Sequence, residues 1–311
     1  MSRLIRLGSR GSQLALWQSR WVKERLQEAD PSLRMEITVI KTTGDKIVGT
    51  PLSKIGDKGL FTKELDRALL SGNIDLAVHS LKDVPTELPA GLGIAAVTER
   101  WDARDALISR GSSSIAALPQ GAAVATGSLR RRAQLLHLRP DLKIIDLRGN
   151  LNTRFRKFDE SDWNAMILAV AGVERLGWGE RISAKIPTTE ILPAVGQGSF
   201  ALISRDDDAP LLAKLRRLNH TPSEIAARAE RAFLRELEGG CQVPIGALAE
   251  VHDNELAFFG CLGDLGGKEL LRERLSGGTS EPEKLGRVIA QRLLKRGGRE
   301  ILKKIRESDA Q

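Results

Sequence analysis

The sequence contains few of the residues that stabilise exported or membrane-spanning proteins. Its 311 residues include no tyrosine and only two cysteines. Two cysteines can form at most one disulfide. The N-terminus, Met-Ser-Arg-Leu-Ile-Arg-Leu-Gly, lacks the apolar core of a signal peptide. No apolar run approaches the roughly 20 residues that a membrane helix needs. We expect a cytoplasmic protein with reduced cysteines and no membrane partner.

Aromatic residues are also scarce, at 4% of the chain, although the net charge is +8 and the pI is near 9.7. A basic chain suggests nucleic acid as a partner, but few side chains here can stack on bases. The 48 basic residues comprise 32 arginines and 16 lysines, and arginine favours paired bonds to carboxylate or phosphate. We therefore expect a small polyanionic ligand and no nucleic acid, and a nucleic-acid protein remains the third possibility.

The sequence contains no recognisable motif for binding a metal or a nucleotide cofactor. The four histidines are scattered, at positions 79, 137, 220 and 252, and no Gly-Lys-Ser/Thr phosphate loop is present. The length predicts two or three domains. Strands alternate with helices for about 220 residues, and hairpin-like runs follow. This order predicts an α/β protein with two doubly wound lobes and a small α+β C-terminal domain.

The N-terminal segment predicts an anion site. Residues 4–8 are expected to form a strand, residues 9–11 a turn, and residues 14–26 a helix that Ser12 caps. Arg10 and Ser12 would then lie at a helix N-terminus, where free amides and the positive end of the dipole attract anions. The alternative is an ordinary capped helix with a solvated arginine.

A second candidate site follows the apolar run of residues 74–79. Val84 precedes a proline and is therefore disfavoured in helical conformation, which places Asp83 on a bend at the carboxyl end of a strand. Open α/β sheets bind their ligands at such ends. The alternative is that Asp83 forms the turn and pairs with Lys82.

The second half repeats this arrangement without repeating the sequence. A strand at residues 121–126 leads into the turn Gly127-Ser128 and a helix that opens with Arg130 and Arg131. Strands at residues 142–147 and 165–171 are followed by further arginines, at 148, 154 and 175. Each arginine alone could be solvated, but a succession of them at strand ends predicts a polyanion site.

Residues 42–59 contain four glycines, a proline and several charges, so we expect a mobile lid, or alternatively a disordered loop. Near the end of the α/β part, apolar residues at 226, 229, 233, 234 and 237 predict a helix that Gly239 and Gly240 terminate. Cys241 would follow on a tight loop that Pro244 stiffens. Its thiol could be a presented nucleophile or a small buried hydrophobe, whereas Cys261 is expected in the core.

Residues 230–246, ERAFLRELEGGCQVPIG, resemble the cofactor-attachment segment of the porphobilinogen deaminase (hydroxymethylbilane synthase) family. The segments SRGSQLALWQ (9–18), HSLKDV (79–84), RGN (148–150) and GQG (196–198) resemble its other motifs. The resemblance covers residues 3–246 motif by motif and the last 65 residues weakly. The chain departs from it at Gly127, where the family commonly has serine.

The resemblance implies a transferase of porphyrin and heme biosynthesis that condenses four porphobilinogen molecules, with loss of ammonia, into hydroxymethylbilane. It implies a dipyrromethane primer held covalently by a thioether to Cys241. The fold implied is that of type II periplasmic binding proteins, with a first lobe at 1–99 and 200–218, a second at 100–199, and the cysteine domain at 219–311. The resemblance also leads us to expect a monomer.

Site residues are carried over by position. The catalytic pair would be Asp83, as a buried carboxylate that stabilises the cation formed on loss of ammonia, and Lys82. Cofactor contacts would come from Cys241, Lys82, Asp83, Thr126, Ser128, Arg130, Arg131, Arg148, Gly149, Arg154, Ala171, Gly172 and Gln197. Substrate contacts would come from Arg10, Ser12, Gln18, Lys54, Lys58, Phe61, Ser80, Arg148, Asn150, Arg154 and Arg175.

The arginines fit this chemistry, because each pyrrole brings an acetate and a propionate, and charge-assisted bonds contribute about 1.5–3 kcal/mol each. The rival of another class is a non-catalytic, two-lobed anion-binding protein. A presented thiol distinguishes the two, since a binding protein has no use for one.

Overall fold

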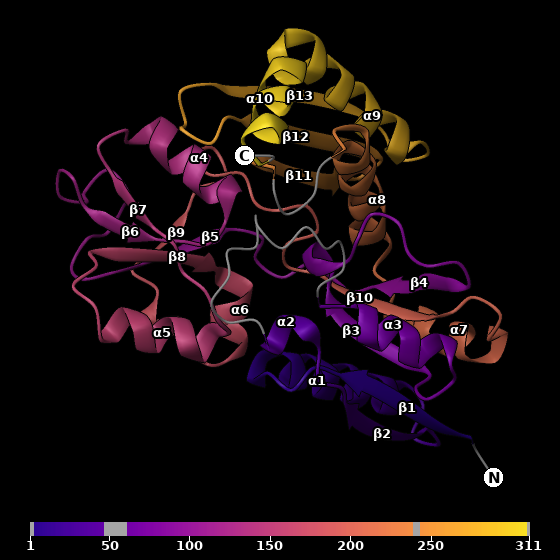
Figure 1. Ribbon diagram of the computed structural model, residues 1–311. Helices are drawn as coiled ribbons and strands as arrows, with labels where there is room; N and C mark the ends of the chain where they lie inside the picture. Colours follow the sequence, from indigo (N-terminus) through magenta and orange to yellow (C-terminus); the bar gives the residue numbers. More distant parts are fainter. Residues whose placement is uncertain (1–2, 47–60, 239–242, 310–311) are drawn as a thin grey trace. The chain divides into compact units, whose positions relative to one another are not determined.

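The computed structural model describes residues 3–46, 61–238 and 243–309. These residues form two compact units (Figure 1). The first unit comprises residues 3–46, 61–101 and 198–224, and the second comprises residues 102–197, 225–238 and 243–309. Within the described residues, no helix is both long and apolar enough to cross a membrane.

The first unit is built on a five-stranded sheet in the order β2-β1-β3-β10-β4. Strands β1, β2 and β3 are parallel, and β10 runs antiparallel to both β3 and β4. The strands are β1 (Leu4–Ser9), β2 (Arg34–Val39), β3 (Leu76–Ser80), β4 (Leu92–Val97) and β10 (Phe200–Arg205). The helices are α1 (Gln13–Ala29), α2 (Thr43–Lys46), α3 (Lys63–Leu70), α7 (Ala209–Leu215) and the 3-10 turns η2 (Leu81–Asp83) and η4 (Arg216–Leu218).

The second unit contains a sheet with the same pattern, in the order β7-β6-β8-β5-β9. Strands β6, β7 and β8 are parallel, and β5 is antiparallel to β8 and β9. The strands are β5 (Asp105–Ser109), β6 (Ala123–Ala125), β7 (Lys143–Ile145), β8 (Ala165–Ala169) and β9 (Ala184–Ile186). The helices are α4 (Leu129–Leu138), α5 (Leu151–Asp159), α6 (Val170–Arg175) and the turn η3 (Gly179–Arg181). The predicted repeat of form, and with it the α/β fold class, is confirmed.

The rest of the second unit is the predicted α+β part. An antiparallel sheet of β11 (Ile245–His252), β12 (Glu255–Gly263) and β13 (Leu270–Gly278) packs against helices. These are α8 (Thr221–Glu236), of which residues 225–236 belong to this unit, α9 (Pro282–Leu293), the π-turn η5 (Leu294–Gly298) and α10 (Arg299–Asp309). The predicted break at Gly297-Gly298 is confirmed, because Gly297 has φ +110°.

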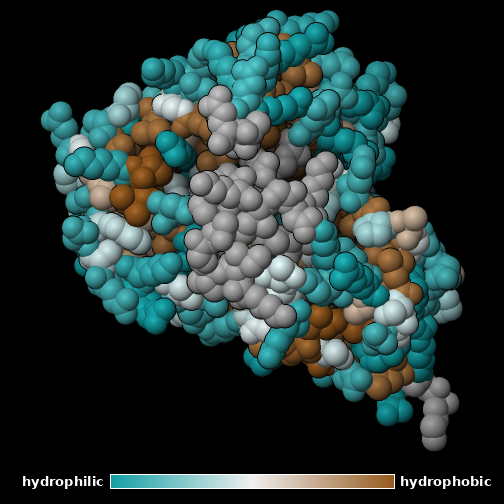
Figure 2. Space-filling view, viewed as in Figure 1, coloured by the Kyte–Doolittle hydropathy of each residue, from teal (hydrophilic) through white to brown (hydrophobic). Residues whose placement is uncertain are grey.

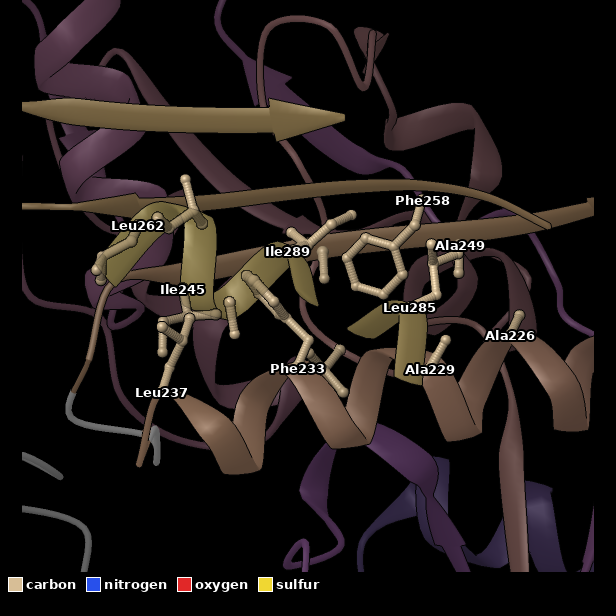
Figure 3. Packing of buried hydrophobic residues seen from close by; sticks show 14 of the residues in the cluster. Ala226, Ala229, Phe233, Leu237, Ile245, Ala249, Phe258, Leu262, Leu285 and Ile289 are labelled. Atoms are coloured by element: carbon tan, nitrogen blue, oxygen red, sulfur yellow. The ribbon is translucent and has the colours of Figure 1, made fainter. Parts of the chain in front are cut away.

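A hydrophobic core of aliphatic residues and two phenylalanines holds the α+β part together. Phe233 of α8 meets Phe258 of β12 edge to face, with ring centroids 5.3 Å apart, and Ile289 of α9 packs beside them (Figure 3). Helix α9 closely approaches α8, since a Cβ at Gly286 would lie 2.1 Å from the Ala229 carbonyl oxygen. The surface over α9 and α10 is mostly hydrophilic in Figure 2, as expected for a solvated face.

One local prediction needs correction. The strand expected at residues 165–171 ends at Ala169, and α6 begins at Val170, whose N–H donates to the Arg104 carbonyl oxygen at 3.1 Å. A continuous apolar run does not distinguish strand from helix, which is why periodicity misplaced this boundary. After α8, the backbone is already left-handed at Glu238, with φ +50°, before the predicted cap glycines, which lie outside the described residues.

A buried carboxylate stabilises the amino end of the first sheet. The Asp75 side chain is fully buried and accepts hydrogen bonds from Arg3 (2.5 Å), from the backbone and side chain of Arg6 (2.9 and 3.0 Å) and from Arg205 (3.4 Å). Burial alone would raise the Asp75 pKa, but the hydrogen bonds from Arg6 and Arg3 outweigh it and lower the pKa to about 2.

This lowered pKa predicts an acid-dependent loss of stability. The folded state holds the Asp75 proton less tightly than the unfolded chain, so its contribution is complete above pH 4 and is lost as the pH falls towards 2. We expect Asp75→Asn to cost about 3 kcal/mol of unfolding free energy at pH 7 and much less near pH 2. Urea unfolding of parent and variant across this range measures the difference. A difference that stays constant with pH would contradict the prediction.

Candidate functional site

In the first unit, the residues that follow β1 and β3 meet at one edge of the sheet, because these two strands are parallel neighbours. The Gln18 side-chain amide donates to Ser80 Oγ at 2.9 Å, which connects α1 to the end of β3. The Arg10 guanidinium lies over the Phe61 ring, 4.2 Å from its centroid. Four predicted site residues thus contact one another in two pairs, Gln18 with Ser80 and Arg10 with Phe61. Ser12 caps α1 as predicted, since its Oγ accepts from the Ala15 N–H at 3.3 Å.

The predicted catalytic residues lie on the turn η2, directly after β3. Val84 is extended, with φ −85° and ψ 123°, as its position before proline predicts. The turn is anchored by Leu81, which is buried and whose N–H donates to the Ser199 carbonyl oxygen at 2.9 Å. Asp83 itself is exposed, so the expectation of a buried carboxylate is wrong: the turn buries Leu81 and Val84 and leaves Asp83 outward.

The residue beneath this turn is uncharged at neutral pH. His79 is 4% exposed, and burial, with a further contribution from the charge of Arg10, lowers its pKa to about 4. His79 therefore adds no positive charge here, whereas Arg10, whose charge acts on His79, and Lys82, on the turn η2 that follows, are cationic.

In the second unit, Thr126, Ser128, Arg130 and Arg131 follow β6. Ser128 caps α4 by accepting from the Arg131 N–H at 3.4 Å, and its own N–H donates to Thr126 Oγ1 at 3.3 Å. Both arginines are 5% exposed. Their guanidinium groups turn towards a residue that sequence reasoning missed, Asp105.

Asp105 is the first residue of β5 and is fully buried. Arg130 Nη1 lies 2.8 Å from its Oδ2, and Arg131 Nη2 lies 2.7 Å from its Oδ1. Gln197, another predicted contact, donates its amide to the same Oδ1 at 2.9 Å. Burial would raise the Asp105 pKa, but the charges of Arg130 and Arg131 hold it well below the usual range. The sequence feature that could have identified Asp105 is its position at the start of an apolar strand.

Arg148, Gly149, Asn150 and Arg154 form the junction between β7 and α5. Asn150 caps α5 by accepting from the Thr153 N–H at 2.9 Å, and Arg154 Nε donates to the Gly149 carbonyl oxygen at 2.8 Å. Arg148 Nε lies 3.2 Å from an Asp146 carboxylate oxygen. The β7–α5 junction therefore contains three side chains with N–H groups that could donate to a carboxylate, those of Arg148, Asn150 and Arg154.

The sequence departure at Gly127 has a steric counterpart at this junction. A Cβ at residue 127 would lie 2.5 Å from the Leu147 carbonyl oxygen and 3.5 Å from Arg148 Nε. A serine there would collide with the backbone that leads to Arg148 unless that backbone moved. The glycine thus allows the ends of β6 and β7 to approach closely.

Ala171, Gly172 and Arg175 all lie on α6, directly after β8. Arg175 is 7% exposed, and burial lowers its pKa to about 9, so it remains mostly protonated at pH 7.

Cys241, Lys54 and Lys58 lie outside the described residues, as does the predicted lid beyond residue 46. The described start of that segment is the short helix α2, where the Thr43 N–H and hydroxyl both donate to Glu64. Cys261 is buried as predicted, and burial raises the pKa of its thiol to about 11.

The donor set of the second unit fits a ligand rich in carboxylates. Five predicted arginines, two hydroxyls and the capped starts of α4 and α5 are supplied at the ends of its parallel strands. Among the described residues, Arg130 Nε and Arg131 Nε are buried without a hydrogen-bond partner. Buried donors of this kind suit an anion. Fold and donor set together define an α/β protein that binds a polycarboxylate.

Comparison with known proteins identifies the family to which the chain belongs. Residues 5–213 match the family model "Porphobilinogen deaminase, dipyromethane cofactor binding domain", and residues 225–295 match "Porphobilinogen deaminase, C-terminal domain". The chain belongs to the porphobilinogen deaminase family. The porphobilinogen deaminase of Syntrophomonas wolfei is 53% identical over 300 residues, covering 96% of this chain and 98% of that protein. That of Chloroherpeton thalassium is 50% identical over 314 residues and covers both chains completely.

Solved structures give partial likenesses. The Bordetella pertussis BvgS periplasmic VFT2 domain has a TM-score of 0.42 and 16% identity, and covers 69% of this chain and 86% of that chain. The methionine binding protein MetQ has a TM-score of 0.43 and 14% identity, covering 69% and 89% respectively. The fold assignment rests on the strand order and pairing described above.

The family defines the reaction. The enzyme is a transferase of tetrapyrrole and heme biosynthesis, a hydroxymethylbilane synthase with a dipyrromethane cofactor. It condenses four porphobilinogen molecules stepwise into hydroxymethylbilane and releases ammonia.

Gly149 provides a test of the β7–α5 junction. It has φ +114°, and a Cβ there would lie 2.6 Å from the Thr153 side chain. We expect Gly149→Ala to destabilise the protein by about 2–4 kcal/mol and to slow attachment of the primer, because Arg148 and Arg154 are displaced. Gly177→Ala is the matched control, since Gly177 has φ +76° but no atom within 4 Å of a Cβ. Thermal unfolding and intact mass measure both effects, and equal results for the two variants would refute the argument.

Proposed function

We propose that the two units divide the reaction. The strand-end cluster of the second unit holds the dipyrromethane, and the first unit supplies the catalytic carboxylate and part of the substrate site. The observation that carries this division is that five predicted arginines lie in the second unit, whereas Asp83 lies in the first. The corresponding domains are 1–99 with 200–218, 100–199, and 219–311.

In the second unit, the dipyrromethane carboxylates are held by charge and by hydrogen bonds. Arg148 and Arg154 make paired bonds, Thr126 and Ser128 donate through their hydroxyls, and the first turn of α4 adds backbone amides. This unit also contributes Arg130, Arg131, Gly149, Ala171, Gly172 and Gln197. Lys82 and Asp83, on the turn η2 of the first unit, are two further proposed cofactor contacts. The dipyrromethane, when bound by a thioether to Cys241, supplies the acceptor carbon to which the first porphobilinogen is joined.

Substrate carboxylates are bound by Arg10, Ser12, Gln18, Lys54, Lys58, Phe61, Ser80, Arg148, Asn150, Arg154 and Arg175. Support in the first unit comes from the pairs Arg10–Phe61 and Gln18–Ser80. In each pair, one side chain fixes the orientation of the other at the edge where Asp83 lies.

The ionised Asp83 carboxylate accepts a hydrogen bond from the pyrrole N–H and stabilises the cation that forms when the protonated aminomethyl group of porphobilinogen leaves as ammonia. Its position on a turn anchored through Leu81 supports this role, because the carboxylate is held on a short segment next to a rigid strand. Lys82, the neighbouring cation, contacts the carboxylates of the reacting rings.

The enzyme works as a cytoplasmic monomer without nucleic acid. Exposed lysines and an arginine of α10 are spread along a solvated helix, where Lys303 and Arg306 face Glu307 and Glu238. Such a mixed-charge face suits solubility better than a duplex backbone. Sedimentation and salt-dependent duplex binding test these points.

The covalent attachment can be tested by mass. We expect the purified active chain to be heavier than its sequence by two linked pyrrole units, and Cys241→Ala to be unmodified and inactive. Cys261→Ala is the matched control, because that thiol is buried with its pKa raised to about 11. It should carry the full added mass. An active chain with the bare polypeptide mass would overturn the assignment.

The role of Asp83 can be separated from turn formation. Asparagine forms the turn equally well but has no charge, whereas glutamate keeps the charge. We expect Asp83→Asn to lose about 3–5 kcal/mol of transition-state stabilisation, at about 1.4 kcal/mol per tenfold in rate, while Asp83→Glu retains measurable turnover. Steady-state kinetics on variants that carry the primer by mass decides. Near-parental turnover of Asp83→Asn would remove Asp83 from the mechanism.

A further inference from the structure

The buried carboxylate of Asp105 connects three segments of the second unit. It lies at the start of β5 and accepts hydrogen bonds from Arg130 and Arg131 of α4 at 2.8 and 2.7 Å, and from Gln197 of the loop before β10 at 2.9 Å. All three partners are residues to which the proposed function assigns primer contacts.

Each guanidinium is also fixed at a second point by a backbone carbonyl. Arg130 Nη1 donates to Leu192 at 2.5 Å, and Arg131 Nη1 donates to Ile167 at 3.0 Å. With one bond to Asp105 and one to the backbone, neither guanidinium can rotate without breaking a buried hydrogen bond. Their Nε atoms, which have no hydrogen-bond partner among the described residues, are therefore held in fixed directions.

The charges of this cluster do not cancel. Two guanidinium groups share one carboxylate, so the triad of Asp105, Arg130 and Arg131 carries one net positive charge in a buried location. Two buried arginines without a carboxylate would repel each other and lose their hydration uncompensated. A fully neutralised pair would have no excess charge to attract an anion.

We infer that Asp105 is a positioning residue for primer attachment: it orients Arg130, Arg131 and Gln197 and leaves the triad with the single positive charge that a primer carboxylate needs. Asp105 itself does not touch the ligand. This inference rests on the proposed site, because it assumes that these three residues face the primer.

The first unit supplies a matched control. Asp75 is also fully buried and also gathers arginines, namely Arg3, Arg6 and Arg205. It precedes β3, at the amino end of its sheet, and none of its partners is a predicted site residue. Asp75→Asn removes the same charge from a similar environment away from the site.

The experiment follows primer attachment directly. Full-length parent, Asp105→Asn, Asp105→Glu and Asp75→Asn are purified from cells that make no porphobilinogen. Porphobilinogen is then added, and the gain of two pyrrole units is followed by intact mass, alongside the melting temperature of each chain. We expect attachment to be at least about tenfold slower in Asp105→Asn, as is typical when the partner that orients a ligand residue is lost. Asp105→Glu should restore part of the rate, and Asp75→Asn should match the parent despite a lower melting temperature.

Parental attachment in Asp105→Asn, or equal slowing in Asp75→Asn, would overturn the inference. If Asp105→Asn does not fold, Asp105→Glu decides: slow attachment in a folded chain supports the inference, and parental attachment refutes it. Failure of both to fold would make Asp105 purely structural, which also refutes it. A parent chain that gains no mass would instead refute attachment at Cys241, so the two failures are distinguishable.

Discussion

The direction of the parallel strands is the constraint on which the site depends. Strands β1 and β3 end at one edge of the first sheet, and β6, β7 and β8 end at one edge of the second. A polar residue placed after any of these strands therefore lies near those placed after its neighbours, however distant in sequence. Ser12, Ser128 and Asn150 each cap the helix that follows such a strand. The same strand-to-helix junction thus occurs several times in the chain, with different side chains after each strand.

Arginines that lie close together repel one another, and a buried aspartate offsets this repulsion in each unit. Asp75 gathers arginines at the amino end of the first sheet. Asp105, which pairs with Ala169 at the carboxyl end of β8, gathers two arginines from the first turn of α4 in the second unit. The chemistry is the same, but the consequences differ. At the amino end the carboxylate ties together strands of the sheet and contributes to stability alone. Beside the predicted contacts of the second unit, it also determines where the guanidinium groups point.

Local features were predictable from the sequence, and long-range ones were not. The proline after Val84 and the hydroxyl of Ser12 act within a few residues, so the bend at Asp83 and the cap of α1 were predicted correctly. Asp105 escaped notice because its partners are 25, 26 and 92 residues away. The exposure of Asp83 depends on how Leu81 and Val84 pack, and the boundary between β8 and α6 lies inside a uniformly apolar run. Neither is encoded in spacing.

Strand β10 has a consequence for synthesis on the ribosome. It separates β3 from the edge strand β4, yet its residues, Phe200–Arg205, are translated after the whole of the second α/β sheet. Until β10 is translated, the first sheet lacks its fourth strand, and β4 lacks the strand with which it pairs in the complete sheet. The second sheet, whose strands all lie between Asp105 and Ile186, has no such gap. Folding during translation is therefore expected to complete the later sheet before the earlier one.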